Sequence, residues 1–362
     1  MKYRFHVLGI PHTITNKDFS ACAYTQKALK FCKMMTERGH HVIHYGHEDS
    51  NVICSEHVTV LSRKTWNKVY GDHDYKKKWF KYDVEDKAYK EFYRRSIKEI
   101  EKRKEEHDFL LPFWGFGVKP ICDHHSDMIV VEPGIGYGGA FARYRVFESY
   151  AIYHGIGGMD AITSCNQDWY HVVIPNYFDL DEFEFNDKKE DYMLFVGRVY
   201  DGKGVNIAIQ VTQALGLKLK IAGQLDEFYE KHGFPDHVEY VGYVTPEERK
   251  ELMKNAMGSY LPSMYSEPFG GVQIENLLCG TPTITTDWGA FSENNINGVT
   301  GYRCRTFGEF VAATRSVVNG DISYEACRKW GENFSLENIA VKYERYFKAI
   351  MDIYTGHGWY EL

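Results

Sequence analysis

Short apolar runs alternate with longer stretches in which apolar residues recur at helical spacing over most of the 362-residue chain. This alternation is typical of a mostly parallel sheet covered by helices. In the first half it predicts buried strands at Tyr3–Leu8, His41–Tyr45, Phe109–Pro112, Met128–Val131, Ala161–Ser164 and Val172–Ile174. In the second half it predicts strands at Asp191–Gly197, Lys218–Gly223, Val238–Val241, Gly258–Leu261 and Thr281–Thr285.

The segment 174–185, IPNYFDLDEFEF, separates the two sets of strands and has neither a helical nor a strand period. Its proline and its polarity are typical of an interdomain linker. We therefore predict a first domain at residues 1–173, a second domain at 174–338, and a C-terminal helix at 339–362 that packs back toward the first domain.

Composition narrows the class of protein. Hydrophobic residues make up 44% and charged residues 26%, as in soluble globular proteins, and the net charge of −7 argues against a nucleic-acid partner. The eight cysteines have no C-x-x-C spacing, which indicates reduced thiols. Because no run resembles a signal peptide or spans a bilayer, we expect a cytoplasmic protein that could still lie on a membrane.

The segment Arg63–Lys104 is basic, with fifteen Lys or Arg against eight Asp or Glu. Its second half predicts an amphipathic helix, since Tyr89, Phe92, Tyr93, Ile97 and Ile100 recur at helical spacing. Two interpretations stay open. The helix is either solvated with its apolar side on the core, or it contacts an acidic acceptor or anionic lipid headgroups.

The strongest chemical signal lies between Ser263 and Thr286, SMYSEPFGGVQIENLLCGTPTITT. Gly270 and Gly271 begin a predicted helix, where uncovered backbone amides favour an anion such as a phosphate. Glu267 precedes this helix and Glu275 lies one turn into it, so the two carboxylates suit opposite ends of one elongated ligand. The alternative is that the glutamates are ordinary surface residues and the glycines serve close packing.

Two cations follow a predicted strand of the second half. Gly197 and Arg198 end that strand and Lys203 lies in the loop beyond it, where ligands bind in open α/β sheets. Together they could neutralise a diphosphate without a metal ion, unless they are simply exposed turn residues. Gly223 and Gln224 close the next strand and are candidates to border the base of a nucleotide.

These elements resemble family four (GT4) of the retaining, GT-B-fold glycosyltransferases. Glu267 and Glu275 match the family's E-x7-E signature, LFVGRVYDGKG at 194–204 its strand–Gly-Arg–Lys-Gly element, VGYVTP at 241–246 its base-binding turn, and VIPNYFDLDEF at 173–183 its linker. The resemblance covers essentially the whole second half, with four elements in the correct order.

The resemblance implies an α/β protein with the GT-B fold, in which two Rossmann-like α/β/α domains face each other across a cleft. The implied reaction is metal-independent transfer of a hexose from a UDP- or GDP-sugar to a glycan, lipid-linked or other hydroxyl acceptor, with no cofactor. The implied donor site contains Arg198 and Lys203 at the diphosphate, Glu275 at the ribose, Glu267 and Phe269 at the sugar, and Gly197, Val244, Gly270 and Gly271 around the ligand.

The first half resembles the family less. Cys32–Tyr45 is similar to its helix–RGH–strand element, so we interpret Arg38 and His40 as structural. GIPHT at 9–13 replaces the family's paired glycines, and Glu132 stands where a histidine is expected. We expect the loop 132–139 to face the cleft, with Glu132 catalytic and Gly136 and Tyr137 near sugar or acceptor. Gly9 and His12 are further donor-side candidates, each weighed against a packing role.

Weaker motifs leave other functions open. Gly134, Gly136 and Gly139 form a poor dinucleotide fingerprint, Asp179 and Asp181 form a D-x-D that we interpret as linker polarity, and the residues Cys122–Asp127 are more typical of surface polarity than of zinc. The alternatives are a nucleotide-sugar epimerase or sugar phosphorylase on the same scaffold, a glycosyltransferase acting on modified DNA, or a catalytically silent sugar-nucleotide binder.

Overall fold

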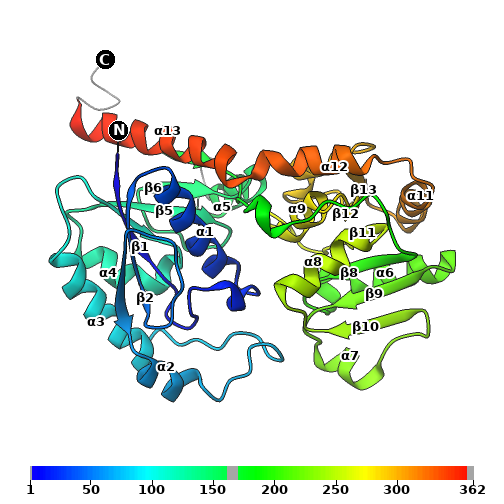
Figure 1. Cartoon of the computed structure of the whole chain (residues 1–362), viewed down its shortest axis with the longest axis horizontal. Coiled ribbons are helices and arrows are strands. Elements are labelled where there is room, and N and C mark those ends of the chain that lie inside the picture. Colours follow the sequence, from blue (N-terminus) through cyan, green and yellow to red (C-terminus); the bar gives the residue numbers. More distant parts are fainter. Residues whose placement is uncertain (1, 161–169, 357–362) are drawn as a thin grey trace.

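The computed structural model describes residues 2–160 and 170–356, apart from the side chain of Asp160. Two α/β lobes lie side by side, and α12 and α13 run along one edge of both (Figure 1). Every paired strand runs parallel to its neighbour. The predicted α/β fold with two sheets is therefore confirmed.

The first sheet has seven strands in the order β3-β2-β1-β4-β5-β6-β7. The strands are β1 Arg4–Leu8, β2 His41–His47, β3 Glu56–Leu61, β4 Phe109–Pro112, β5 Ile129–Ile135, β6 Tyr144–Phe147 and β7 His171–Val173. The helices of this domain are η1 Lys17–Phe19, α1 Ala23–Glu37, α2 Arg63–Tyr70, α3 Lys87–Glu101, η2 Gly115–Val118, α4 Lys119–His124 and α5 Tyr150–Asp160.

The second sheet has six strands in the order β10-β9-β8-β11-β12-β13. The strands are β8 Tyr192–Val196, β9 Lys218–Ala222, β10 Val238–Gly242, β11 Gly258–Leu261, β12 Thr283–Thr286 and β13 Gly301–Cys304. The linker and second domain contain the helices η3 Leu180–Glu182, η4 Asp201–Lys203, α6 Val205–Leu215, α7 Glu227–His232, α8 Pro246–Asn255, α9 Gly271–Leu278, α10 Phe291–Asn294, α11 Phe307–Val318, α12 Tyr324–Gly331 and η5 Glu332–Phe334.

Ten of the predicted strands occur within a few residues of their predicted limits. The eleventh, Ala161–Ser164, lies outside the described residues. The strands β3, β6 and β13 were not predicted. Helices of both domains begin with capping residues. Asp86 accepts a hydrogen bond from the Tyr89 amide at the start of α3, and Thr245 and Glu248 form a capping box at the start of α8, directly after the VGYVT turn.

The last helix, α13 Leu336–Thr355, returns to the first domain. Ile339, Tyr343 and Phe347 are buried in one core with Phe5 and Phe31, as expected for a C-terminal helix that packs back. The helix begins three residues earlier than predicted, because the Ser335 side chain accepts a hydrogen bond from the Asn338 amide and caps it.

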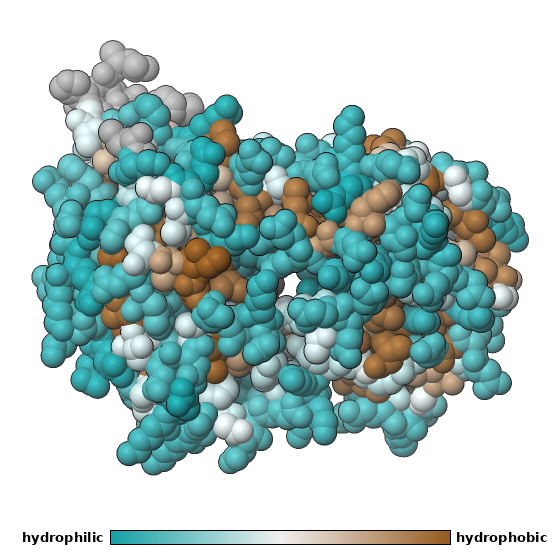
Figure 2. All heavy atoms as spheres, viewed as in Figure 1, coloured by the Kyte–Doolittle hydropathy of each residue, from teal (hydrophilic) through white to brown (hydrophobic). Residues whose placement is uncertain are grey.

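The basic segment contains the predicted amphipathic helix. Tyr89, Phe92 and Ile100 of α3 are buried, and the neighbouring lysines face solvent. The face of the molecule in Figure 2 is largely hydrophilic and is hollowed between the two lobes. Within residues 2–160 and 170–356, no helix has the length and apolarity needed to cross a membrane.

Candidate active site between the two domains

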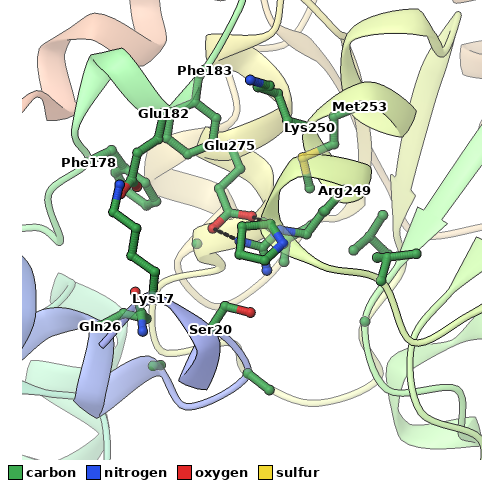
Figure 3. A pocket seen from close by; sticks show the side chains of 18 of the residues that line it. Lys17, Ser20, Gln26, Phe178, Glu182, Phe183, Arg249, Lys250, Met253 and Glu275 are labelled. Carbon is green, nitrogen blue, oxygen red and sulfur yellow. Dashed lines mark hydrogen bonds and ion pairs between the residues drawn. The ribbon is translucent and has the colours of Figure 1, made fainter. Parts of the chain in front are cut away.

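A cavity of about 680 Å3 lies between the two domains, and both contribute to its wall. Lys17, Ser20 and Gln26 approach it from the start of the first domain, whereas Arg249 and Glu275 approach it from the second (Figure 3). The linker residues Phe178, Glu182 and Phe183 form a third side (Figure 3). A ligand in this cavity would contact both domains at once.

The structure brings together six of the residues predicted for donor binding. All six line the cavity, from the β8–α6 and β10–α8 connections and from α9 of the second domain: Gly197, Arg198, Lys203, Val244, Gly271 and Glu275. Parallel strands present their carboxyl ends at one edge of the sheet, which is why residues nearly eighty positions apart meet there. Gly223 and Gln224 line the same cavity.

The start of α9 has the geometry of an anion site. Gly270 precedes the helix with a φ of 78°, and no side chain caps the helix. A Cβ atom at Gly270 would lie 2.5 Å from the Phe291 ring, so both the backbone conformation and the packing require glycine. The first amides of α9 are therefore left for a ligand, and Gly271 lies at the cavity wall.

Glu275 faces a cation that the sequence analysis did not single out. The Arg249 guanidinium lies 3.4 Å from the Glu275 carboxylate, a loose contact drawn as a dashed line in Figure 3. One carboxylate oxygen, Oε2, is buried without a hydrogen-bond partner among the described residues. A buried acceptor without a donor is costly, so this oxygen is suited to a hydroxyl donor from a ligand. Arg249 lies one turn beyond the VGYVTP motif, which is the signal that could have found it.

Glu267 lies behind the cavity wall. Its carboxylate forms an ion pair with Lys203 and accepts a hydrogen bond from Ser263 Oγ at 2.7 Å. The side chain is almost fully buried. Glu267 therefore positions the Lys203 ammonium at the cavity surface and offsets part of its charge.

Phe269 was predicted to surround the transferred sugar, but its ring is buried in the core of the second domain. It packs against Phe178 and Phe334, with ring centroids 6.2 Å and 5.7 Å away. Both partners lie far from Phe269 in the sequence, so the motif gave no sign that this ring points inward.

Glu132 does not lie in a loop facing the cleft, as predicted, but within β5, where it is fully buried. Tyr137 Oη donates to its carboxylate at 2.6 Å, and the amides of Phe141 and Ala142 donate at 2.9 Å and 3.1 Å. Burial raises the pKa of this carboxyl. Glu132 thus holds the following loop together, and Tyr137 serves the same purpose.

Gly9 and His12 are likewise internal to the first domain rather than on the donor side of the cleft. The Gly9 amide donates to the Tyr45 carbonyl at 2.8 Å, and buried His12 Nδ1 lies 2.8 Å from Tyr89 Oη. Gly136, another first-domain candidate, lies close to the second domain. A Cβ atom there would lie 3.0 Å from Pro268, directly after Glu267.

A buried cluster at the domain boundary was missed by the sequence analysis. Lys27 of α1 forms an ion pair with Glu148 and donates to the Gly134 carbonyl at 2.8 Å. Asn176 of the linker donates to the other Glu148 oxygen at 3.0 Å. Lys27 and Asn176 also line the cavity, opposite the donor-side residues. No motif marks these residues, because each comes from a different segment.

The acidic linker residues pair with lysines of the first domain. Asp179 forms an ion pair with Lys33 and also caps η3, and Glu182 lies 3.4 Å from Lys17 and 3.2 Å from Lys30. Asp179 is therefore engaged in joining the linker to α1, in line with its interpretation as linker polarity.

The candidate metal ligands of the first half lie away from this cavity. Ligand atoms of Glu101, His124 and His125 lie within 4.8 Å of one another, but the Lys104 ammonium already contacts Glu101 at 2.9 Å. Cys122 is buried in the core of the first domain. The residues Cys122–Asp127 therefore do not line the interdomain cavity.

Comparisons with known proteins agree with this arrangement. Residues 178–334 match the family described as Glycosyl transferases group 1. Glycogen synthase of Mycobacterium tuberculosis is 36% identical over 140 residues, covering 35% of this chain and 34% of that protein. An uncharacterized glycosyltransferase of Methanocaldococcus jannaschii is 32% identical over 123 residues, covering 30% and 31%. Each match spans about a third of the curated relative.

Solved structures resemble the whole chain. AviGT4, a glycosyltransferase involved in avilamycin A biosynthesis, has a TM-score of 0.73 at 16% identity and covers 96% of this chain and 98% of its own. Sucrose-phosphate synthase from Thermosynechococcus elongatus has a TM-score of 0.68 at 14% identity, with 97% and 99% covered. Anabaena HepE, in complex with UDP and glucose, has 0.67 at 11%, with 96% and 100% covered.

These likenesses define the class: the two facing α/β domains form a GT-B fold. Within that class, residues 178–334 of the second domain match the model of the group 1 glycosyl transferases.

Proposed function

We propose that the protein is a retaining glycosyltransferase of family four, which transfers a hexose from a UDP- or GDP-sugar to a hydroxyl of a glycan or lipid-linked acceptor. The observation that carries the proposal is the meeting of Arg198, Lys203, Glu275 and the uncapped start of α9 at one cavity. Cations, helix amides and a carboxylate that is only loosely paired suit a nucleoside diphosphate. HepE, which shares the fold, holds UDP and glucose.

In this proposal the diphosphate occupies the amides at Gly271, between Arg198 and Lys203. Glu275 accepts hydrogen bonds from the ribose through Oε2, the oxygen that accepts no hydrogen bond within the described residues. The diphosphate gains negative charge as the glycosidic bond breaks, so cations fixed beside it stabilise the transition state more than the bound donor. The acceptor approaches from the Lys27 and Asn176 side, on the same face as the departing phosphate.

Carboxylates near the cavity are paired with cations, which does not suit a covalent nucleophile. Glu267 is buried against Lys203, Glu275 faces Arg249, and Asp179 and Glu182 of the linker pair with lysines of the first domain. We therefore favour attack by the acceptor on the face that the leaving phosphate vacates, without a metal ion. Dialysis against EDTA should leave turnover unchanged, and a loss restored by manganese would contradict this part of the proposal.

The experiment that tests the function is a donor screen followed by a turnover assay. Thermal shift with UDP, GDP, ADP and CMP and their sugars identifies the base, because a ligand at about 100 times its dissociation constant stabilises by roughly 2.7 kcal/mol. Sugar transfer to an added acceptor with retained anomeric configuration supports the proposal. Donor turnover that is independent of an acceptor would instead favour an epimerase, and phosphate-dependent release of sugar phosphate a phosphorylase.

We propose that the basic segment Arg63–Lys104 binds the acceptor substrate or the membrane that carries it. The side chains of Lys76, Lys77 and Lys78 are exposed on the segment that precedes α3. They are suited to an acidic glycan or to anionic lipid headgroups. Binding to vesicles containing anionic lipid, measured at low and high salt, tests the membrane form of this idea.

A further inference from the structure

The segment 71–86 between α2 and α3 belongs to the first domain but contacts the second. The Gln224 side-chain amide donates to the backbone carbonyl of Tyr75 and lies 3.5 Å from that of Lys78. Gln224 closes β9 and lines the cavity. This segment therefore lies against the donor-side wall.

Aromatic packing fixes the segment to its own domain. The Tyr75 ring stacks on Phe19 and on Phe80, with centroids 4.5 Å and 5.3 Å apart. His73 Nε2 lies 2.7 Å from the Trp79 carbonyl oxygen, which fixes the turn that carries Trp79. These contacts hold the backbone around Trp79 against the first domain.

Trp79 contacts Arg198, a residue predicted to bind the diphosphate. The Arg198 guanidinium carbon lies 4.0 Å from the centre of the Trp79 ring and 5.2 Å from that of Tyr200. The indole of Trp79 is 51% exposed and lines the cavity, so this large ring is not part of a core. A half-exposed tryptophan over a cation is a cation–π contact between the two domains.

Arg198 differs from the other donor-side cations in what surrounds it. Lys203 is paired with Glu267 and Arg249 faces Glu275, but no carboxylate among the described residues pairs with Arg198. Its guanidinium carbon lies over the Trp79 and Tyr200 rings, and no acceptor among the described residues takes a hydrogen bond from its N–H groups. These donors are therefore available for a phosphate.

We propose that Trp79 is a positioning residue of the donor site, supplied by the first domain, which orients the Arg198 guanidinium so that its free edge binds the diphosphate of a nucleoside diphosphate. This inference rests on the proposed function and adds a residue from the opposite domain to it. Because the stack joins the two domains, diphosphate binding is coupled to their closed arrangement.

The test is a double-mutant cycle on nucleoside diphosphate affinity, measured by calorimetry with UDP and GDP. Trp79→Ala should weaken the binding of whichever nucleotide, UDP or GDP, binds the wild-type protein more tightly. The expected loss of affinity is about 2- to 30-fold, the range of cation–π contacts. Arg198→Ala should weaken it more, and the double variant should be no weaker than Arg198→Ala, because Trp79 acts through Arg198. Trp79→Phe should recover most of the affinity.

Tyr82→Ala is the matched control. Tyr82 is an exposed aromatic residue of the same segment, but its ring packs on His12 and Trp114 within the first domain. It should leave the affinity unchanged, and thermal unfolding should verify that every variant folds. The inference is overturned if the Trp79 and Arg198 losses add, if Trp79→Ala has no effect, or if Tyr82→Ala acts like Trp79→Ala. If the wild-type protein binds neither UDP nor GDP, both the proposed function and this inference fail. If the protein binds nucleotide and turns over donor, but neither depends on Trp79, only this inference fails.

Discussion

Glu267 and Glu275 each face a cation, but their surroundings differ. Glu267 is engaged by Lys203 and Ser263, so its oxygen Oε1 already has partners. Glu275 faces Arg249 at the long distance of 3.4 Å, and its Oε2, although part of this ion pair, accepts no hydrogen bond among the described residues. The first carboxylate is thus arranged to hold a neighbouring side chain, and the second to accept a ligand.

Replacement of the two glutamates should therefore affect different quantities. Glu275→Ala should weaken binding of donor and free nucleoside diphosphate alike, by about 1.5–3 kcal/mol for a lost charged hydrogen bond. Glu267→Ala should lower kcat far more than nucleoside diphosphate affinity. Lys203 loses its orientation but is no longer offset by a carboxylate, and its position matters most when the leaving phosphate gains charge. Calorimetry and steady-state kinetics measure both. Loss of nucleotide binding in Glu267→Ala but not in Glu275→Ala would reverse the ligand orientation.

Buried His12 should make folding sensitive to acid. Its desolvation lowers its pKa to about 3, against 6.5 for an exposed histidine. Between these values the unfolded chain binds a proton that the folded chain does not, so stability decreases as the pH falls below 6.5. His12 should account for about 1.4 kcal/mol of lost unfolding free energy between pH 7.5 and pH 5.5.

Urea unfolding of wild type and His12→Gln at the two pH values measures this. The variant should lose less stability on acidification, and exposed His41→Gln serves as the control. Equal pH dependence in wild type and His12→Gln would show that His12 is protonated in the folded protein.

Side chains that follow a strand or begin a helix could be predicted from the sequence. Arg198 and Gly271 occupy such positions, and both line the cavity. Lys27, Glu148 and Glu132 could not be assigned, because their environment depends on segments that are distant in the chain. Burial of a polar residue and the identity of its partner are properties of the packed structure rather than of a local motif.

At the scale of elements, the missed strands lie toward the edges of the sheets. β3 and β13 are edge strands, and β6 is next to the edge strand β7. Central strands such as β8, YMLFV, are buried and read as continuous apolar runs, whereas β3, EHVTVL, mixes polar and apolar residues. Hydrophobic pattern therefore predicts the middle of a parallel sheet better than its borders.

The role of the start of α9 can be tested by comparing alanine substitutions at two glycines with positive φ, Gly270 and Gly298. Gly270→Ala would add an unfavourable φ and a contact 2.5 Å from Phe291, whereas Gly298, at a φ of 75°, has open space around it. Gly298→Ala should cost about 1 kcal/mol of stability for its backbone conformation alone. Gly270→Ala should cost more and should also weaken nucleoside diphosphate binding, since the helix amides move. Urea unfolding and calorimetry distinguish the two, and equal effects would remove the start of α9 from the site.

At the scale of the whole molecule, the second domain caps a helix of the first. The Glu293 carboxylate of α10 accepts hydrogen bonds from the amides of Tyr150 and Ala151 at the start of α5, at 2.9 Å and 2.7 Å. A carboxylate at a helix N-terminus is favourable, and this one acts only while the domains are together. It is a contact that stabilises the arrangement of the two domains seen in the structure.

Glu293→Ala should shift the protein toward a more open form. We expect a larger radius of gyration in small-angle X-ray scattering without ligand, and a weaker donor affinity. Glu309→Ala is the control, because Glu309 caps α11 within the second domain and should alter stability without altering shape. Identical scattering for wild type and Glu293→Ala would show that this contact does not hold the domains together.

The chain passes between the domains twice, through the linker and again before α13. The two passages are bonded to each other: the Phe178 amide donates to the Phe334 carbonyl at 2.9 Å, and the Leu336 amide donates to the Phe178 carbonyl at 3.0 Å. A single flexible tether would let one lobe translate and twist against the other. We expect the two bonded passages to restrict relative motion of the domains more than one tether would, and so to keep Trp79 in register with Arg198.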